Sequence, residues 1–267
     1  MLTLGIDTSN YATSLAVFDT DAGEVVCDCK KFLPVKEGQL GLRQSDALFH
    51  HTAALPAMLA ELGARADLTQ VRAVGVSARP RPVEGSYMPC FLAGVSVATA
   101  FSLSRALPLI ELTHQQGHIA AALYAAGDFT LFERESLVFH VSGGTTDLLL
   151  CHGAERITPL GTSSDLYAGQ AVDRLGVKLG FPFPAGVYVS EQAALCKEKV
   201  HPKVSVHGLT CSLSGLENQC AKLLADGHDA PYVCNTVCSA WAKRLCGWQT
   251  TPWPSIRVCP WFLRAAL

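Results

Sequence analysis

The chain has 267 residues, a formal net charge of −2 and a hydrophobic fraction of 49%, which is enough to bury a sizeable core and favours two lobes of α/β type. Because the chain carries no net positive charge, it would have to bind any nucleic acid through a local basic patch or through a partner protein. Asp7 interrupts the first apolar run, so no signal peptide or membrane span is predicted, and we expect a cytoplasmic protein.

The chain has 11 cysteines, an odd number without paired CxxC spacing. Reduced thiols, several of them buried as small hydrophobic side chains, are therefore expected. A zinc site built on Cys234 and Cys238 stays open as an alternative, although no second ligand pair stands at a usual spacing.

The first 112 residues alternate predicted strands with predicted helices. Apolar runs between turn-rich segments predict strands at 2–8, 14–19, 25–31, 71–77 and 108–112. Leucines at helical spacing predict a helix over 45–62, which Pro56 is expected to kink or split, and a second helix is predicted over 91–104. Strands alternating with helices indicate an α/β lobe.

Two turns of similar chemistry interrupt the predicted strands. The first, "LGIDTSNYATS", contains Thr8 and Ser9 between two apolar runs, and the second, "HVSGGTTDLLL", contains Ser142, Gly143 and Gly144 between predicted strands. Such a turn can leave backbone N–H groups unpaired and so suits an anion such as phosphate, although each turn alone could be an ordinary hairpin. The pair indicates an internal duplication, as in the two-lobed domains of actin, hexokinase and Hsp70, which grip nucleotide phosphates between facing hairpins.

The segment "THQQGHIAAALYAAG" carries His114 and His118, four residues apart. On a helix both rings project from one face and can share a metal ion. Two ligands fall short of the three protein ligands that catalytic metal sites generally use, so two exposed helix histidines remain the alternative.

A further helix is predicted over 166–179, followed by the loop "GFPFPAG". Asp173 on this helix could hold ribose hydroxyls, and its alternative role is that of a surface charge. Asp165 lies eight residues earlier, roughly a helix face away from Asp173.

Five motifs, "LGIDTSNYATS", "THQQGH", "VSGGTTD", "AGQAVDRLGVKLGFPFPAG" and "CSLSGLENQ", stand in the order and spacing of the TsaD (Gcp) family, formerly described as O-sialoglycoprotein endopeptidase. The chain resembles this family from residue 1 to about 240. The resemblance implies an ASKHA fold, the two-lobed α/β architecture of actin, hexokinase and Hsp70, with duplicated units of sheet plus helices and an incomplete second lobe here. It also implies transfer of a threonylcarbamoyl group from threonylcarbamoyl-AMP to the N6 amine of an adenine beside the tRNA anticodon.

The resemblance also implies a role for each motif residue. His114 and His118 would bind one divalent ion, iron or zinc, which acts as a Lewis acid. The donor, threonylcarbamoyl-AMP or ATP, would be bound by the other motif residues: Ser142, Gly143, Gly144, Asp173, Gly186, Thr8 and Ser9. The implied partners are tRNA, a TsaB-like ASKHA protein and a TsaE-like ATPase.

Several positions depart from the family pattern. Ala12 stands where the family has an acidic residue, Thr145 stands where it has a histidine, and "SARPRPVEGSY" replaces a Gly-Pro-Gly loop. These changes indicate a divergent paralogue. A noncatalytic nucleotide-binding subunit or scaffold is the alternative function, whereas a metallopeptidase is disfavoured because the HExxH glutamate is missing.

The expected organisation is an N-terminal lobe at 1–112, a partial C-terminal lobe at 113–240 and an aberrant tail at 241–267. The tail holds all 4 tryptophans and shows no helical or strand period, and the family's Gly-rich loop with its asparagine and the later metal-binding aspartate are not found in it. A truncated or frameshifted reading frame from about residue 240 is expected, so the chain is expected to transfer poorly. A genuine short variant is the alternative.

Overall fold

The computed structural model describes residues 1–35, 42–127, 130, 133–153, 155–203 and 205–249, and their side chains except those of 206 and 241–249. The described part of the chain forms two compact units, the first ending at His118 and the second beginning at Ile119. In the described part of the chain, no helix is long and apolar enough to cross a membrane.

The first unit is built on a five-stranded sheet in the order β3-β2-β1-β4-β5. Its strands are β1 (Leu2–Ser9), β2 (Ala12–Asp19), β3 (Glu24–Phe32), β4 (Val71–Arg79) and β5 (Leu109–Thr113). The first three form an antiparallel meander, and β4 and β5 run parallel to β1. The predicted strands are therefore confirmed. Along β1 and β2, buried apolar side chains alternate with more exposed ones and fill the core.

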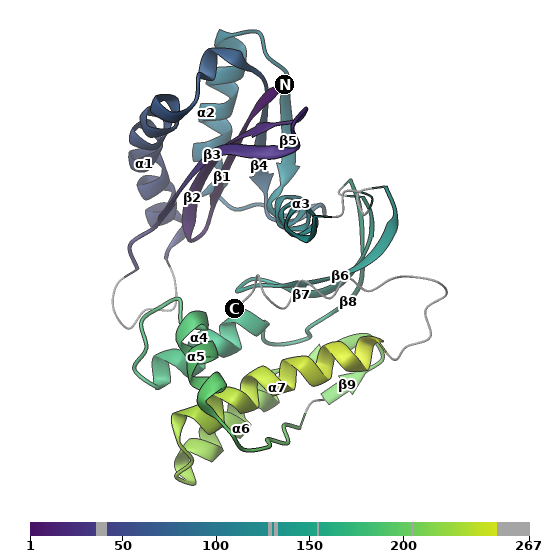
Figure 1. The fold of residues 1–267 in the computed structure, drawn as a ribbon. Helices are drawn as coiled ribbons and strands as arrows, with labels where there is room; N and C mark the ends of the chain where they lie inside the picture. The colour runs from purple at the N-terminus through teal and green to yellow at the C-terminus, as the bar shows by residue number, and fades with distance from the viewer. Residues whose placement is uncertain (36–41, 128–129, 131–132, 154, 204, 250–267) are drawn as a thin grey trace. The chain divides into compact units, whose positions relative to one another are not determined.

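Helices α1 (Gln44–Arg65) and α2 (Phe91–Ser104) cover that face of the sheet (Figure 1). The short 3-10 helix η1 (Leu68–Gln70) precedes β4, and α3 (His114–Ala126) follows β5 directly. Pro56 was expected to kink or split α1, and the split does not occur, because α1 is one helix from Gln44 to Arg65. Pro56 lies on its exposed side, where water can take the place of the missing backbone hydrogen bond.

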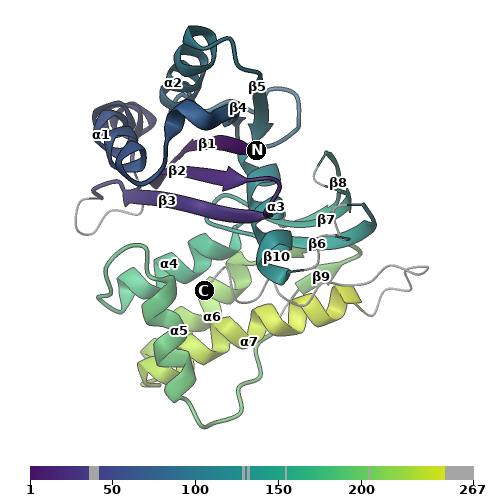
Figure 2. The ribbon, with the colours of Figure 1, turned by 45° about the horizontal axis from the view of Figure 1, so that its top comes forward.

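The second unit contains a second antiparallel meander, in the order β6-β7-β8, beside a small two-stranded ribbon (Figure 2). Its elements are β6 (Glu135–Val141), β7 (Thr146–His152), β8 (Arg156–Thr162), α4 (Ala168–Lys178), α5 (Gly186–Leu195), β9 (Ser205–His207), β10 (Thr210–Ser212), α6 (Ser214–Ala225) and α7 (Ala230–Gln249). Each unit thus begins its sheet with a three-stranded meander, as the predicted duplication requires. Directly after β8, Ser163 forms a single parallel bridge with Cys211 of β10.

Helices α4 to α7 enclose an apolar core of their own, which contains Leu175, Val189, Leu216 and Cys234. Burial raises the pKa of Cys234 to about 12, and Cys238 packs against the same core. A thiol in this environment is a poor zinc ligand, because zinc binds the thiolate. The pair is therefore better explained as core packing than as the zinc site left open above.

The last described element does not match the expected loss of regular structure near residue 240. Helix α7 continues through Gln249, since the first proline beyond its N-terminal turn is Pro252. The rest of the predicted tail, 250–267, lies outside the described residues.

Candidate functional site

The predicted metal-binding pair lies at the start of α3, in the first unit. The imidazoles of His114 and His118 contact each other edge to face, with ring centroids 4.2 Å apart and planes inclined by 70°. The rings project together because residues four apart lie on one face of a helix.

Asp7, at the end of β1, orients the first of these rings. His114 Nδ1 lies 2.8 Å from Asp7 Oδ2, and the backbone N–H of Ser9 donates to the other carboxylate oxygen at 2.9 Å. Burial by itself raises the pKa of Asp7, but the hydrogen bond and charge of His114, with hydrogen bonds from Ser77 on β4 and from Ser9, hold it well below its usual range. Asp7 is therefore a carboxylate that accepts the Nδ1 proton of His114 and fixes the orientation of its ring.

His118 is maintained in its neutral form. Although the residue is exposed, the protein around its imidazole lowers the pKa, and the electrostatic interaction with the adjacent His114 lowers it further. A neutral imidazole is the form that binds a metal.

The donor set therefore fits part of a metal centre. Imidazole nitrogens suit iron and zinc, the two rings are adjacent, and a carboxylate fixes the orientation of one of them. No group of three or more His, Cys, Asp or Glu side chains suited to a metal ion is found among the described residues.

The turn of the second hairpin, Ser142 to Thr145, lies in the second unit and is closed by its own hydrogen bonds. Ser142 N donates to Thr145 O at 2.9 Å, while the N–H groups of Gly144 and Thr145 donate to Ser142 Oγ at 3.2 and 3.1 Å. The expectation of several open amides is thus not met in this structure, because the serine hydroxyl satisfies two of them.

The same hydroxyl starts a chain of polar contacts that leads into the sheet. Ser142 Oγ lies 2.9 Å from Thr145 Oγ1, which lies 2.8 Å from Nδ1 of the buried His140. Since two N–H groups occupy the lone pairs of Ser142 Oγ, its proton goes to Thr145, and the Thr145 proton goes to His140. Thr145, which replaces the family's histidine, is therefore bonded to a histidine that this chain carries five residues earlier.

Helix α4 begins directly against this turn. Gly169 N donates to Ser142 O at 3.0 Å, and Ala168 N donates to Thr146 Oγ1 at 2.8 Å. A Cβ on Gly169 would lie 2.6 Å from Gly143 N and 2.7 Å from the carbonyl carbon of Ser142. Only glycine fits here, so the turn and the helix N-terminus are fixed as one piece.

Asp173 and Gly186 are joined through the start of α5. Asp173 Oδ1 accepts a hydrogen bond from Ala185 N at 2.8 Å, and burial raises the pKa of Asp173 although that hydrogen bond opposes it. A Cβ on Gly186 would meet nothing within 4 Å. One carboxylate oxygen therefore caps α5, next to a glycine with open space above its backbone.

The two predicted residues of the first turn differ in their accessibility. Thr8 is fully buried, and its hydroxyl donates to Phe91 O at 3.4 Å and accepts from Gly94 N at 3.1 Å. This places the Thr8 side chain in the contact with α2 and not at a ligand. Ser9 remains partly exposed.

Asp7, His140 and Asp165 have structural roles that sequence reasoning missed. Asp165 accepts hydrogen bonds from Leu213 N at 2.7 Å and from the hydroxyls of Ser212 and Ser214, both at 2.6 Å, and so ties the segment before α4 to the start of α6. All three residues lie within or beside the quoted motifs, but their hydrogen-bond partners lie elsewhere in the sequence. The only sequence feature that could have pointed to these residues was their position in or near a motif.

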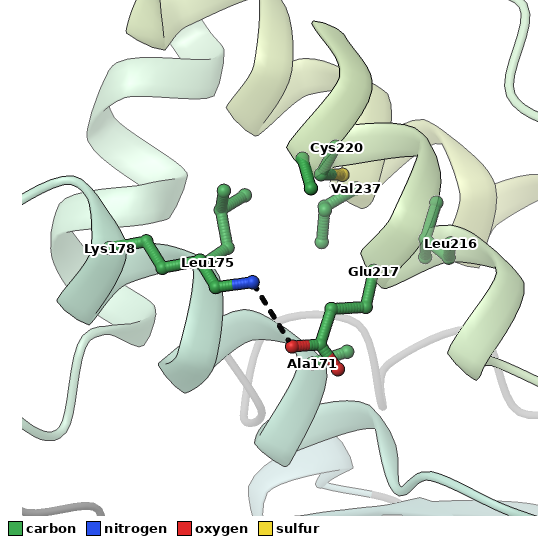
Figure 3. Close-up of a pocket in the computed structure, with 8 residues that line it drawn as sticks. Ala171, Leu175, Lys178, Leu216, Glu217, Cys220 and Val237 are labelled. Carbon is green, nitrogen blue, oxygen red and sulfur yellow. Dashed lines mark hydrogen bonds and ion pairs between the residues drawn. The ribbon is translucent and has the colours of Figure 1, made fainter. Parts of the chain in front are cut away.

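A small hollow lies between α4, α6 and α7 (Figure 3). Its volume open to the centre of a water molecule is about 10 Å³, which corresponds to a single water. Apolar side chains such as Leu175 and Leu216 line it, and Lys178 pairs with Glu217 at 3.2 Å beside it. It is too small for a nucleotide.

Comparison with known sequences gives a consistent family. Residues 35–251 match the TsaD family, described as tRNA N6-adenosine threonylcarbamoyltransferase, and this match extends past the predicted change near residue 240. A protein of that description from Campylobacter concisus is 32% identical over 228 residues, which cover 81% of this chain and 63% of the relative. One from Archaeoglobus fulgidus is 25% identical, covering 85% and 66%, and one from Onion yellows phytoplasma is 31% identical, covering 83% and 93%. The chain thus spans less than two thirds of the first two relatives.

Solved structures agree with the two-lobed fold. HypF from T. kodakarensis superimposes with a TM-score of 0.55 at 11% identity, covering 92% of this chain and 39% of that protein. The activator of 2-hydroxyisocaproyl-CoA dehydratase from Clostridium difficile, solved with bound ADPNP, gives a TM-score of 0.53 at 10% identity, covering 97% and 79%. At this level of identity, these likenesses show the α/β ASKHA fold alone.

Proposed function

Because the chain belongs to the TsaD family of tRNA N6-adenosine threonylcarbamoyltransferases, we propose that it transfers a threonylcarbamoyl group to the N6 amine of a tRNA adenosine. The observation that carries the proposal is the Asp7–His114–His118 arrangement, in which a carboxylate orients one of two adjacent imidazoles. This is the arrangement of a metal-binding histidine with its supporting carboxylate.

His114 and His118 would hold a divalent ion, iron or zinc, with Asp7 as the residue that orients His114. Bound there, the ion would supply Lewis-acid polarisation of an oxygen of the donor. The hydrogen bond between Asp7 and Nδ1 of His114 directs Nε2 of that ring toward the ion.

The donor, threonylcarbamoyl-AMP or ATP, would bind to the second unit. Gly143 and Gly144 carry no side chains at the turn, so a phosphate or carbamoyl group could approach the backbone. Asp173 has a second carboxylate oxygen suited to ribose hydroxyls, and Gly186 leaves room beside it. Ser142 and Ser9 are the hydroxyl-bearing residues we assign to the same donor.

The acceptor would be tRNA, which implies a cytoplasmic protein. Family resemblance adds a TsaB-like ASKHA protein and a TsaE-like ATPase as partners. The N6 amine must lose a proton as it forms the new bond to the carbamoyl carbon, and the adenylate leaves with the bonding electron pair.

The test is an assay of the purified chain with labelled threonylcarbamoyl-AMP, unmodified tRNA, a divalent ion and the two partner proteins. Label should enter tRNA, and both His114→Ala and Gly143→Val should abolish its transfer. Calorimetric titration with AMP should show binding that is lost in Gly143→Val and retained in His114→Ala. Nucleotide binding without any transfer would contradict the proposal and support the noncatalytic subunit.

A further inference from the structure

The segment between α5 and β9 exposes a row of cationic side chains. In residues 196–203, Lys197, Lys199, His201 and Lys203 occupy every second position, and all four are exposed. The segment is neither helix nor strand, and its backbone bends at Glu198. We call residues 197–203 the basic strap.

Two of the residues that alternate with the cations contact the protein, and this turns the cationic side chains toward solvent. Val200 is 9% exposed and Pro202 is buried, whereas Glu198 is exposed. From Lys199 to Lys203, the protein-facing positions are therefore apolar.

Two helices hold the strap backbone. Gln219 on α6 donates through Nε2 to Lys203 O at 2.7 Å and accepts from Lys203 N at 2.9 Å. On α7, Asn235 Nδ2 donates to Glu198 O at 3.5 Å. The lysines are thus carried on a fixed backbone that runs beside α6 and α7 (Figure 2).

The charges of the strap are not neutralised as those of α4 are. Arg174 and Lys178 both pair with Glu217, at 3.1 and 3.2 Å. No ion pair to Lys197, Lys199 or Lys203 is recorded within the described ranges, and Glu198 is the single acidic residue in the strap. The strap is therefore a local positive surface on a chain whose formal net charge is −2.

We propose that the basic strap binds the sugar-phosphate backbone of the tRNA acceptor, a proposal that rests on the proposed function. At about 3.3 Å per residue, a fully extended run of this length would span roughly 20 Å, so the bent strap covers at most that distance, enough to face more than one phosphate. Lysine ammonium groups act as point charges, so they position an RNA without reading its sequence. Phosphates repeat regularly along an RNA backbone, as the lysines do along the strap, whereas carboxylates on an acidic protein surface do not. This favours RNA over an acidic protein as the binding partner.

The experiment compares tRNA binding by the full chain and by the triple variant Lys197→Gln/Lys199→Gln/Lys203→Gln, measured by fluorescence anisotropy between 50 and 300 mM salt. Three lost contacts to single-stranded phosphates should reduce the slope of log K against log[salt] by about 2. At 0.1 M salt this corresponds to a roughly 100-fold weaker association. The loss should be similar for tRNAs of different sequence.

The matched control is Lys31→Gln/Arg43→Gln/Arg72→Gln, which removes the same charge from exposed positions of the first unit. This control variant should show the same slope of log K for tRNA against log[salt] as the wild type. AMP affinity should be equal in the wild type and in both triple variants. Equal losses in both triple variants would overturn the proposal, because net charge would then explain them. An unchanged slope in the strap variant would also overturn it, even where transfer to tRNA occurs, and would turn attention to an acidic protein partner.

Discussion

The two hairpins that open the two sheets share a polar contact but differ in what holds them. In the first unit, Thr13 Oγ1 lies 2.8 Å from Nδ1 of the buried His51 on α1. In the second, Thr145 Oγ1 lies 2.8 Å from Nδ1 of His140, on the strand that leads into the turn. Each hairpin thus has a threonine bonded to a buried histidine. In the first hairpin the histidine lies on a helix, and in the second it lies on a strand of the same hairpin.

The difference separates structural from ligand-facing positions. The first hairpin is tied to the two helices behind the sheet, through Thr8 to α2 and through Asn10, whose Oδ1 accepts from Gln44 Nε2 at 2.7 Å, to α1. The second closes on its own residues and on the start of α4, which leaves Gly144 without neighbours above it. Similar motifs therefore need not contribute equally to binding.

The largest expected effect is at the second hairpin. Gly169→Val should destabilise the protein by about 3 kcal/mol, because the new side chain would meet backbone atoms of the turn that cannot move cheaply. Chemical denaturation measures the loss, and AMP titration should show that binding is lost as well. Gly215→Ala is the control, since a Cβ there meets nothing within 4 Å. Equal stability of the two variants would show that the turn is not fixed by α4.

The same substitution made in both hairpins sharpens the comparison. Thr13→Val and Thr145→Val should each cost about 1–3 kcal/mol of unfolding free energy, since each leaves a buried imidazole nitrogen without its hydroxyl partner. Only Thr145→Val should weaken AMP binding, because Thr145 also contacts Ser142. Urea denaturation and calorimetry on both variants provide the test. Equal loss of AMP affinity would erase the distinction between the hairpins.

A smaller effect is expected at Asp7, which links the first hairpin to α3. Asp7→Ala should weaken zinc binding by about tenfold, because His114 loses the carboxylate that orients it. Asp7→Asn should retain part of that affinity through its amide oxygen. Competition with a zinc-sensitive dye measures both variants, and zinc affinity equal to that of the wild type in Asp7→Ala would rule out the orienting role.

The smallest effect concerns pH. Burial lowers the pKa of His51 below 6.5 in the folded state, so the unfolded chain binds more protons and stability falls as pH drops below about 6.5. His51→Asn should make that fall shallower, by at most about 1.4 kcal/mol per pH unit. The lowered pKa of His118 acts in the same direction and is present in both proteins. Asp7, with its lowered pKa, should lose its contribution only below about pH 3.8.

This pH dependence is measured by urea denaturation at pH 7.0, 6.0 and 5.0 in the presence of a chelator. The chelator removes any metal bound to His114 and His118, whose affinity also depends on pH. Parallel pH curves for wild type and His51→Asn would show that His51 titrates alike in both states.

The amino-acid sequence by itself determined the elements whose side chains repeat locally. Apolar runs between turn-rich segments predicted β1 and β2, helical spacing predicted α2, and the four-residue separation of His114 and His118 predicted adjacent rings. These features follow from backbone geometry within a few residues.

Tertiary structure decided which motif residues stay exposed and which hold the fold. Thr8 and Ser9 are neighbours in one motif, yet the packing of α2 buries Thr8 completely. Asp7 contacts His114 across a separation of 107 residues, and Asp165 contacts Leu213 across 48. Periodicity carries no information over such distances, because these partners meet only when strands and helices pack and burial favours pairing each polar group with a specific hydrogen-bond partner.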